Sequence, residues 1–215
     1  MTVPEFTINA TLSDQLYEHL ESAIIDGALA PGSRLHADEV AERFDVSRIP
    51  VREAFRALAA EGWIDIRPRR HTVVARQSDR EYDDLTHARR LIGAEVARLA
   101  ARHRTEADLR VLDQVVADNQ LLLAATDLTE LARNNEAFHV AIAVASGNTV
   151  LVDMVRRIEK RNRWYFVAAF PVTGEVAVDD HRALVDAIRA QDANAAVQLA
   201  QDHVDRWASV VLPPT

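Results

Sequence analysis

Three histidines in the C-terminal half of the chain have the residue type and surroundings of a metal site. They are His139, His181 and His203, and each lies in a segment whose apolar residues repeat at helical spacing. Three such helices can bring their imidazoles together in the core of a bundle, where ring nitrogens suit zinc, nickel or a similar ion. The separations of 42 and 22 residues do not form a metal motif. The residues therefore also permit three unconnected core histidines.

A second chemical feature is an arginine-rich stretch in the N-terminal third. Residues 46–76 contain seven Arg and three acidic residues, a local charge of +4 in a chain whose net charge is −8. The guanidinium is a planar fork of donors that suits phosphates and guanine edges. Because binding depends on where the basic groups lie rather than on the average charge, this stretch predicts nucleic-acid binding.

The sequence around these arginines predicts three helices followed by a hairpin. Apolar spacing predicts helices over 12–26, 36–44 and 48–62, with Ser47 as the N-cap of the third helix. Residues 63–75 alternate, break at Arg67-Pro68 and resume, which is typical of a two-stranded hairpin with a basic tip. Three helices with a tight turn before the third, followed by such a wing, predict a winged helix-turn-helix.

In this arrangement the third helix fits the major groove of duplex DNA, and the residues at its N-terminal end reach furthest into the groove. Arg48 and Arg52 are four residues apart and share one helical face. The remaining candidates follow the Pro31-Gly32 turn or lie at the wing tip. The predicted DNA-binding residues are Arg34, Ser47, Arg48, Arg52, Arg69, Arg70 and His71.

Beyond Gln77 the pattern becomes helical throughout. The boundary predicts a winged-helix domain over 1–77 and an all-helical domain over 78–215, and the fold class is therefore mainly α. Thr105 and Asp127 are expected caps, and Gly147-Asn148 is an expected break. The expected helices cover 79–103, 105–125, 127–146, 148–169, 175–190 and 192–211.

Composition excludes several classes of protein. Of the 215 residues, 48% are hydrophobic and 27% charged, which is a globular rather than a disordered composition. There is no cysteine, so disulfides and thiolate metal sites are excluded. No apolar run reaches the roughly 18 residues of a membrane helix, and the first residues do not resemble a signal peptide. We therefore expect a cytoplasmic protein without a membrane partner.

The segment GALAPGSRLHADEVAERFDVSRIPVREAFRALAAEGWIDIRPRRHTVVA resembles the GntR family of bacterial transcription regulators over about 50 contiguous residues. The matching pattern is G-x-L-x-P-G-x-x-L, then L/V-A-x-x-F-x-V-S-R-x-P-V-R-E-A, then L-x-x-E-G. The resemblance implies that Arg34, Arg48 and Arg52 contact operator DNA and that the wing tip enters the minor groove. His71 stands where the family usually has Gly or another small residue.

The opening RRLIGAEVARLAA of the helical domain resembles the FadR-like subfamily, in which an FCD domain of six or seven helices responds to a ligand. The resemblance implies that His139, His181 and His203 bind a divalent metal, with zinc expected and nickel or manganese as alternatives. Asn135 stands where the family has a metal-binding Asp and would supply a neutral carbonyl oxygen. The resemblance also implies that Arg89 binds a small carboxylate effector.

Three functions compete on this basis. The first is a homodimeric, ligand-controlled regulator, a repressor rather than an enzyme, that binds double-stranded operator DNA and an organic acid. The second is a metal-dependent enzyme, because three histidines with an open position could activate water; no HExxH, P-loop or nucleophile elbow is present, and the fused winged helix weighs against catalysis. The third is a regulator whose helical domain only dimerises.

Overall fold

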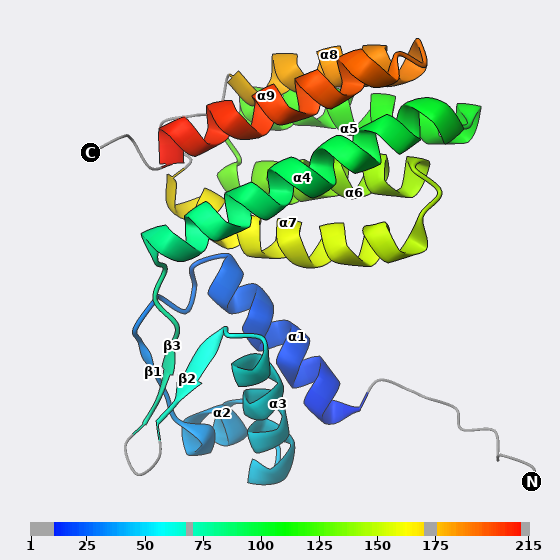
Figure 1. Cartoon of the computed structure of the whole chain (residues 1–215). Helices are drawn as coiled ribbons and strands as arrows, with labels where there is room; N and C mark the ends of the chain where they lie inside the picture. Colours follow the sequence, from blue (N-terminus) through cyan, green and yellow to red (C-terminus); the bar gives the residue numbers. More distant parts are fainter. Residues whose placement is uncertain (1–10, 68–70, 170–175, 212–215) are drawn as a thin grey trace, which may run out of the picture. The chain divides into compact units, whose positions relative to one another are not determined.

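The fold is mainly α, as the sequence predicted, and the chain divides into two units, Met1–Arg76 and Gln77–Thr215. The computed structural model describes residues 11–67, 71–169 and 176–211. Figure 1 shows the helices and strands of both units. Within the described residues, no helix is long and apolar enough to cross a membrane.

The N-terminal unit contains the three predicted helices. The first begins at Leu12 because Thr11 and Asp14 form a reciprocal capping box, in which each side chain accepts a backbone N–H from the other residue. The third helix is followed by Gly62, whose φ of 77° lies in the left-handed region that glycine adopts without strain. The helices are α1 (Leu12–Ile25), α2 (Ala37–Arg43) and α3 (Arg48–Ala60).

The predicted hairpin is present as part of a three-stranded antiparallel sheet. Strands β2 (Ile64–Ile66) and β3 (Thr72–Val74) pair with each other, and β1 (Arg34–Leu35) adds to the other side of β3. The short extended segment after the Pro-Gly turn thus joins the wing. The basic tip at residues 68–70 lies outside the described residues.

The core of this unit lies between α1, α3 and the sheet. Leu20, Val51, Phe55, Leu58 and Trp63 are buried, so the apolar spacing of α3 identified the inner face correctly. Val40 and Phe44 are apolar as well, but both are only partly buried. The Phe44 ring instead packs edge-on against the ring of His19, with a centroid separation of 5.0 Å.

The C-terminal unit is a bundle of helices, six within the described residues. Their ends follow local chemistry: the side chains of Thr105 and Asp127 accept backbone N–H groups at the starts of α5 and α6, as predicted. Helix α4 packs against α6, α7, α8 and α9. The helices are α4 (Asp79–His103), α5 (Glu106–Ala125), α6 (Leu128–Ala145), α7 (Thr149–Ala169), α8 (Val176–Arg189) and α9 (Ala193–Val211).

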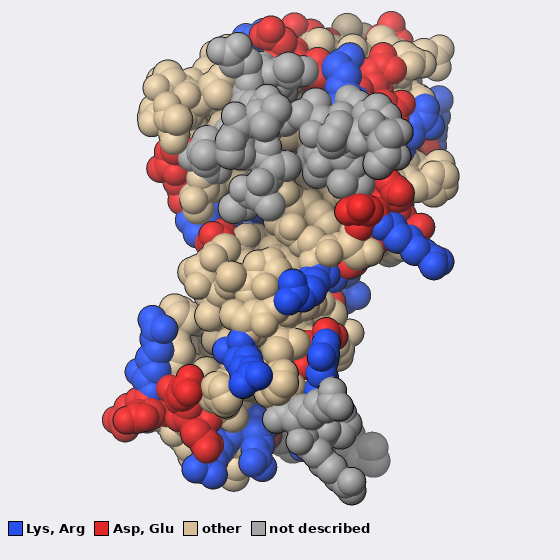
Figure 2. Space-filling model, turned by 90° about the vertical axis from the view of Figure 1, so that its left-hand side faces the viewer, with Lys and Arg blue, Asp and Glu red and all other residues tan. Residues whose placement is uncertain are grey.

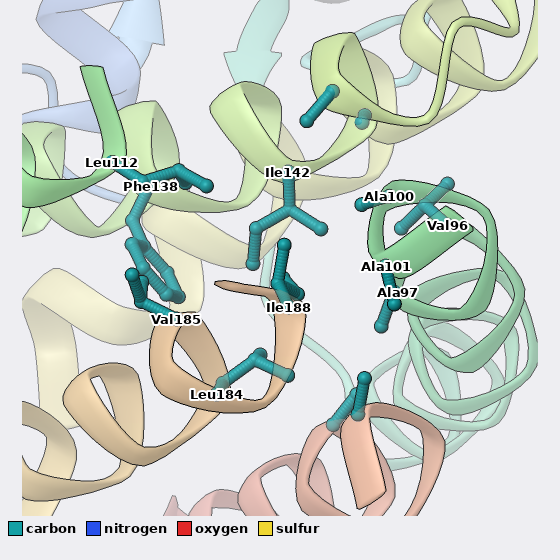
Figure 3. Close-up of a cluster of buried hydrophobic side chains, with 14 of the residues drawn as sticks. Val96, Ala97, Ala100, Ala101, Leu112, Phe138, Ile142, Leu184, Val185 and Ile188 are labelled. Atoms are coloured by element: carbon teal, nitrogen blue, oxygen red, sulfur yellow. The ribbon is translucent and has the colours of Figure 1, made fainter. Parts of the chain in front are cut away.

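The apolar core of the bundle combines small residues, mainly on α4 and α9, with larger ones on α6 and α8. Figure 3 shows Ala97 and Ala101 of α4 near Ile188 of α8, with Phe138 and Ile142 from α6 in the same cluster. Alanines on α4 allow close approach of its neighbours. This close packing is what can bring side chains from several helices to one point in the interior.

Candidate metal centre and nucleic-acid interface

The N-terminal end of α3 presents the predicted recognition residues to solvent. Ser47, Arg48 and Arg52 are exposed, whereas Val51 and Phe55 on the other face are buried. Ser47 occupies the N-cap position, but its side chain makes no capping hydrogen bond, contrary to the role expected from its residue type. Its hydroxyl is therefore not committed to the helix end and can meet an external phosphate or base.

Arg48 forms an ion pair on the protein surface. Its Nε lies 2.7 Å from Oδ1 of Asp38 on α2, and about two-thirds of each side chain is exposed. Such a pair contributes about 0–1 kcal/mol, so a DNA base or phosphate can displace it at little cost. Figure 2 shows basic side chains on the surface of this unit beside acidic ones.

The other predicted DNA-binding residues lie around the wing. Arg34 is exposed on β1, and His71 is partly buried immediately before β3. Arg69 and Arg70 lie outside the described residues. The structure therefore brings Ser47, Arg48 and Arg52 to one helix end and places Arg34 and His71 on the adjoining sheet segment.

Sequence reasoning missed Ile49. This residue is 69% exposed near the N-terminal end of α3, where an isoleucine has no core to pack against. The signal was present in the sequence, because position 49 does not fall on the helical face defined by Val51, Phe55 and Leu58. An exposed aliphatic group at this end of a recognition helix suits contact with a thymine methyl group.

In the helical unit, the three predicted histidines converge. His139 lies on α6, His181 on α8 and His203 on α9, and one ligand nitrogen from each lies within 4.8 Å of the others. The ring centroids of His181 and His203 are 4.8 Å apart. His181 stacks on Phe138 at 3.8 Å, which holds its ring in place. One small ion could contact all three nitrogens after small side-chain movements.

Unpartnered polar atoms mark this cluster as fit for a metal. Both ring nitrogens of His181, Nε2 of His203 and Oδ1 of Asn135 are buried without a hydrogen-bond partner among the described residues. Buried polar groups are normally satisfied, so several orphaned lone pairs together indicate a missing ligand. Asn135 precedes His139 by one turn of α6, which places both on one face. These donors, three imidazoles and an amide oxygen, suit a borderline divalent ion.

Asp180 fixes the orientation of His203. Its Oδ2 lies 3.4 Å from Nδ1 of His203, and Arg206 holds the same carboxylate through Nε at 2.8 Å. Burial alone would raise the pKa of Asp180, but the hydrogen bonds from His203 and Arg206 outweigh it and lower the pKa. An ionised Asp180 favours the proton on Nδ1 of His203, which leaves the lone pair on Nε2 for a metal.

Burial of the three imidazoles favours the neutral form that metals bind. Burial lowers the pKa of His139 and of His181 well below the usual range, and the nearby Arg89 charge lowers both further. Burial also lowers the pKa of His203, although Asp180 opposes part of this shift. No proton must therefore leave these rings at neutral pH before an ion binds.

Arg89 lies beside the histidines, but its main partner is a carboxylate of the protein itself. Its Nε and Nη2 donate to the two oxygens of Glu159 on α7 at 2.9 and 3.0 Å. The side chains are 4% and 6% exposed, and Nη2 lies 3.5 Å from Nε2 of His139. Arg89 is next to the cluster as expected, while the bidentate fork expected for an effector carboxylate is already occupied.

Glu159 is the residue of this site that sequence reasoning missed. It follows Val152 and Val155 at helical spacing, so it occupies the inward face of α7. A charged residue on an otherwise buried apolar face was the available signal, because such a charge needs a buried partner. The partner itself lies 70 residues away and could not be identified from α7 alone.

Comparison with known families agrees with this architecture. Residues 12–74 match the model of "Bacterial regulatory proteins, gntR family", and residues 84–206 match that of the FCD domain. The HTH-type transcriptional repressor RspR of Escherichia coli is 29% identical over 215 residues, covering 98% of this chain and 94% of that protein. The galactonate operon transcriptional repressor of Escherichia coli is 29% identical over 219 residues, covering 90% and 93% respectively.

Solved structures show the same fold. Escherichia coli McbR/YncC superposes with a TM-score of 0.82 at 21% identity, covering 94% of this chain and 98% of that one. A putative GntR regulator from Rhodococcus sp. RHA1 gives a TM-score of 0.81 at 23% identity, with the same coverage of both chains.

These relatives are named as transcription regulators rather than enzymes, so the comparisons support regulation rather than catalysis. The matches span both units of the chain, the winged helix and the helical bundle. The chain belongs to the FadR-like subfamily of GntR regulators and is a DNA-binding transcription regulator with a winged helix-turn-helix and an FCD domain.

Proposed function

We propose that the chain is a homodimeric repressor whose FCD domain binds one divalent metal and a small organic acid, and that the acid changes its affinity for operator DNA. The metal ligands are Asn135, His139, His181 and His203. Zinc is the proposed ion, because three imidazole donors suit it; nickel and manganese are the alternatives. Repression is proposed because relatives along the whole chain are named repressors.

The observation that carries this proposal is the convergence of three histidines, of which both ring nitrogens of His181 and Nε2 of His203 are buried without a hydrogen-bond partner among the described residues. A bound dication would supply positive charge and an open coordination position for a carboxylate. Arg89 adds a neighbouring donor, because Glu159 takes two of its five N–H groups. Acid binding at this point would bridge the metal site and α4.

Helix α4 offers a route from the site to the DNA-binding domain. It carries Arg89 and begins at Asp79, three residues after the N-terminal unit ends at Arg76. If α4 can take two positions, a ligand bound between α4 and its neighbours makes different contacts in each of them. This difference in contacts is what can couple ligand binding to DNA binding. A coupling of about 1–3 kcal/mol is typical of such systems.

For the DNA interface, we assign base contacts to Arg48 and Arg52, because their side chains leave the exposed N-terminal end of α3. Arg34, Ser47, Arg69, Arg70 and His71 are assigned to the phosphate backbone or the minor groove. A homodimer follows from the paired half-sites that helix-turn-helix proteins read. If the helical domain served only for dimerisation, the converging unpartnered nitrogens would have no role.

Elemental analysis of purified protein after zinc loading and dialysis tests the metal site. We expect one zinc per chain in the wild type and in the His87→Ala control, because His87 is exposed on α4 and far from the cluster in sequence. His181→Ala and His203→Ala should each lose the ion. A wild type without stoichiometric metal, or histidine variants that retain it, would contradict the site.

Operator binding tests the effector. A duplex selected from random sequences serves as operator, and its affinity for zinc-loaded protein is measured with and without a panel of hydroxy, keto, sugar, dicarboxylic and aliphatic acids. At least one acid should shift the affinity by about five- to 150-fold, which corresponds to the typical coupling. An unchanged affinity across the panel would leave dimerisation as the function of the helical domain.

A further inference from the structure

The pocket beside the histidines has a polar end and an apolar wall. Of its thirteen lining residues, seven are Ile, Leu or Val, two are Gly or Ala, and four are polar or charged. The wall includes Ile92 and Val96 of α4, Ile142 of α6 and Val155 of α7. A ligand that fills this space contacts mainly aliphatic carbon.

The four polar lining residues form one contiguous group. Arg89 contacts Glu159 at 2.9 Å and approaches His139 at 3.5 Å, and the ring of His139 lies 5.2 Å from that of His203. Among the described lining residues, the hydrogen-bonding side chains are therefore grouped at the metal end of the pocket. Hydroxyl groups further along a ligand would face Ile, Leu and Val without partners.

Charge within the pocket restricts the ligand further. Arg89 and Glu159 form a buried pair whose charges cancel, so the pair offers no net attraction for a second anion. A second carboxylate on the ligand would either lie against the aliphatic wall or meet Glu159. Both placements are unfavourable, because a buried charge needs a partner of opposite sign.

From this asymmetry we infer that the effector is an aliphatic monocarboxylic acid, with its carboxylate at the metal end and its hydrocarbon chain on the wall formed by α4, α6, α7, α8 and α9. This inference rests on the metal and acid site proposed above and specifies the class of acid. Sugar acids and dicarboxylic acids are excluded by the same contacts.

Three acids of the same length, six carbons, represent the three classes of ligand. Hexanoate is the aliphatic acid, gluconate the sugar acid and adipate the dicarboxylic acid. Their affinities for zinc-loaded full-length protein are measured by calorimetry, with acetate as the short reference. Hexanoate should bind most tightly, gaining about three- to fourfold over acetate for each added methylene that is buried. Gluconate should lose roughly fivefold or more for each hydroxyl buried without a partner. Adipate should bind at least about tenfold more weakly than hexanoate.

Gly93 provides a variant that narrows the pocket without disturbing the fold. It lines the pocket on the same face of α4 as Arg89 and Val96, and a Cβ atom added there meets nothing within 4 Å. Gly93→Ala should leave the protein at least as heat-stable, because alanine favours a helix more than glycine does. It should weaken hexanoate by about threefold or more while acetate is unaffected.

The outcomes distinguish this inference from the proposed function. Gluconate or adipate binding as tightly as hexanoate, or hexanoate binding no more tightly than acetate, would overturn the aliphatic class and leave an acid-binding site in place. Failure of all four acids to bind zinc-loaded protein would overturn the acid site itself, and the inference with it. Equal weakening of acetate and hexanoate by Gly93→Ala would show that the chain does not lie along α4.

Discussion

Removal of the Glu159 carboxylate should destabilise the helical domain strongly. Arg89 and Glu159 are 4% and 6% exposed and share two hydrogen bonds of 2.9 and 3.0 Å. Glu159→Ala leaves a buried guanidinium without its partner, which typically costs about 3–5 kcal/mol. Because the pair borders a pocket that water can enter, we expect the lower end, about 3 kcal/mol. For a chain of this size, that lowers the Tm by roughly 6–12 °C.

Urea unfolding followed by circular dichroism measures this loss, and a double-mutant cycle assigns it to the pair. Arg89→Leu and Glu159→Leu should each be destabilising, whereas the double variant should recover part of the loss, because apolar residues can replace a buried pair. Glu95→Ala is the matched control. Glu95 pairs with Arg98 on the solvent side of the same helix α4, and loss of such a partly exposed pair costs about 0–1 kcal/mol.

The reasoning fails if Glu159→Ala costs no more than Glu95→Ala, or if the two leucine variants are additive. Either result would mean that Glu159 does not hold Arg89 in the effector-free protein. The guanidinium fork would then be available to an effector carboxylate, as the sequence resemblance implied. The stability measurement therefore also decides which group recognises the acid.

Three further predictions address the two sites. Arg48→Ala should weaken binding to a selected operator by about 1–3 kcal/mol in gel-shift titrations and leave random DNA unchanged; an equal loss on both would reduce Arg48 to a phosphate contact. Asn135→Asp should tighten zinc and reduce the effect of hexanoate on zinc affinity, because a carboxylate cancels one of the ion's charges; unaltered zinc titrations would remove Asn135 from the metal ligands. Asp180→Asn should lower zinc affinity by about 10–100-fold by loosening His203, and an unchanged affinity would show that Asp180 does not orient that ring.

The helices were predictable because their signals are local. The interval 79–103 was predicted and found with the same bounds, since the apolar stripe and the Ser78 cap lie within a few residues of each other in sequence. Thr105 and Asp127 likewise cap their helices as expected. The hydrogen bonding of Ser47 was harder to predict. A serine side chain at an N-cap position can accept a backbone N–H of the helix or bind another partner, and the residue type does not distinguish the two.

The candidate site depended on contacts that no single helix encodes. The histidines were identifiable as apolar-face residues, but their approach to within 4.8 Å results from packing between α6, α8 and α9. Arg89 was assigned to an external carboxylate because its internal partner is far away in sequence. An inward-facing Glu159 on α7 indicated that a buried cation must exist, yet only the packing of α4 against α7 identifies that cation as Arg89.

The charges around the proposed metal make metal and acid binding mutually dependent. Arg89 is cancelled by Glu159, the histidines are neutral, and Asn135 contributes no charge. The Asp180 carboxylate is paired with Arg206 on the far side of His203. The attraction for an anion in this pocket must therefore come from the ion itself, and an acid that binds the ion must in turn stabilise it by the same free energy. If the proposed function is correct, this regulator would respond to the acid only when its metal is bound.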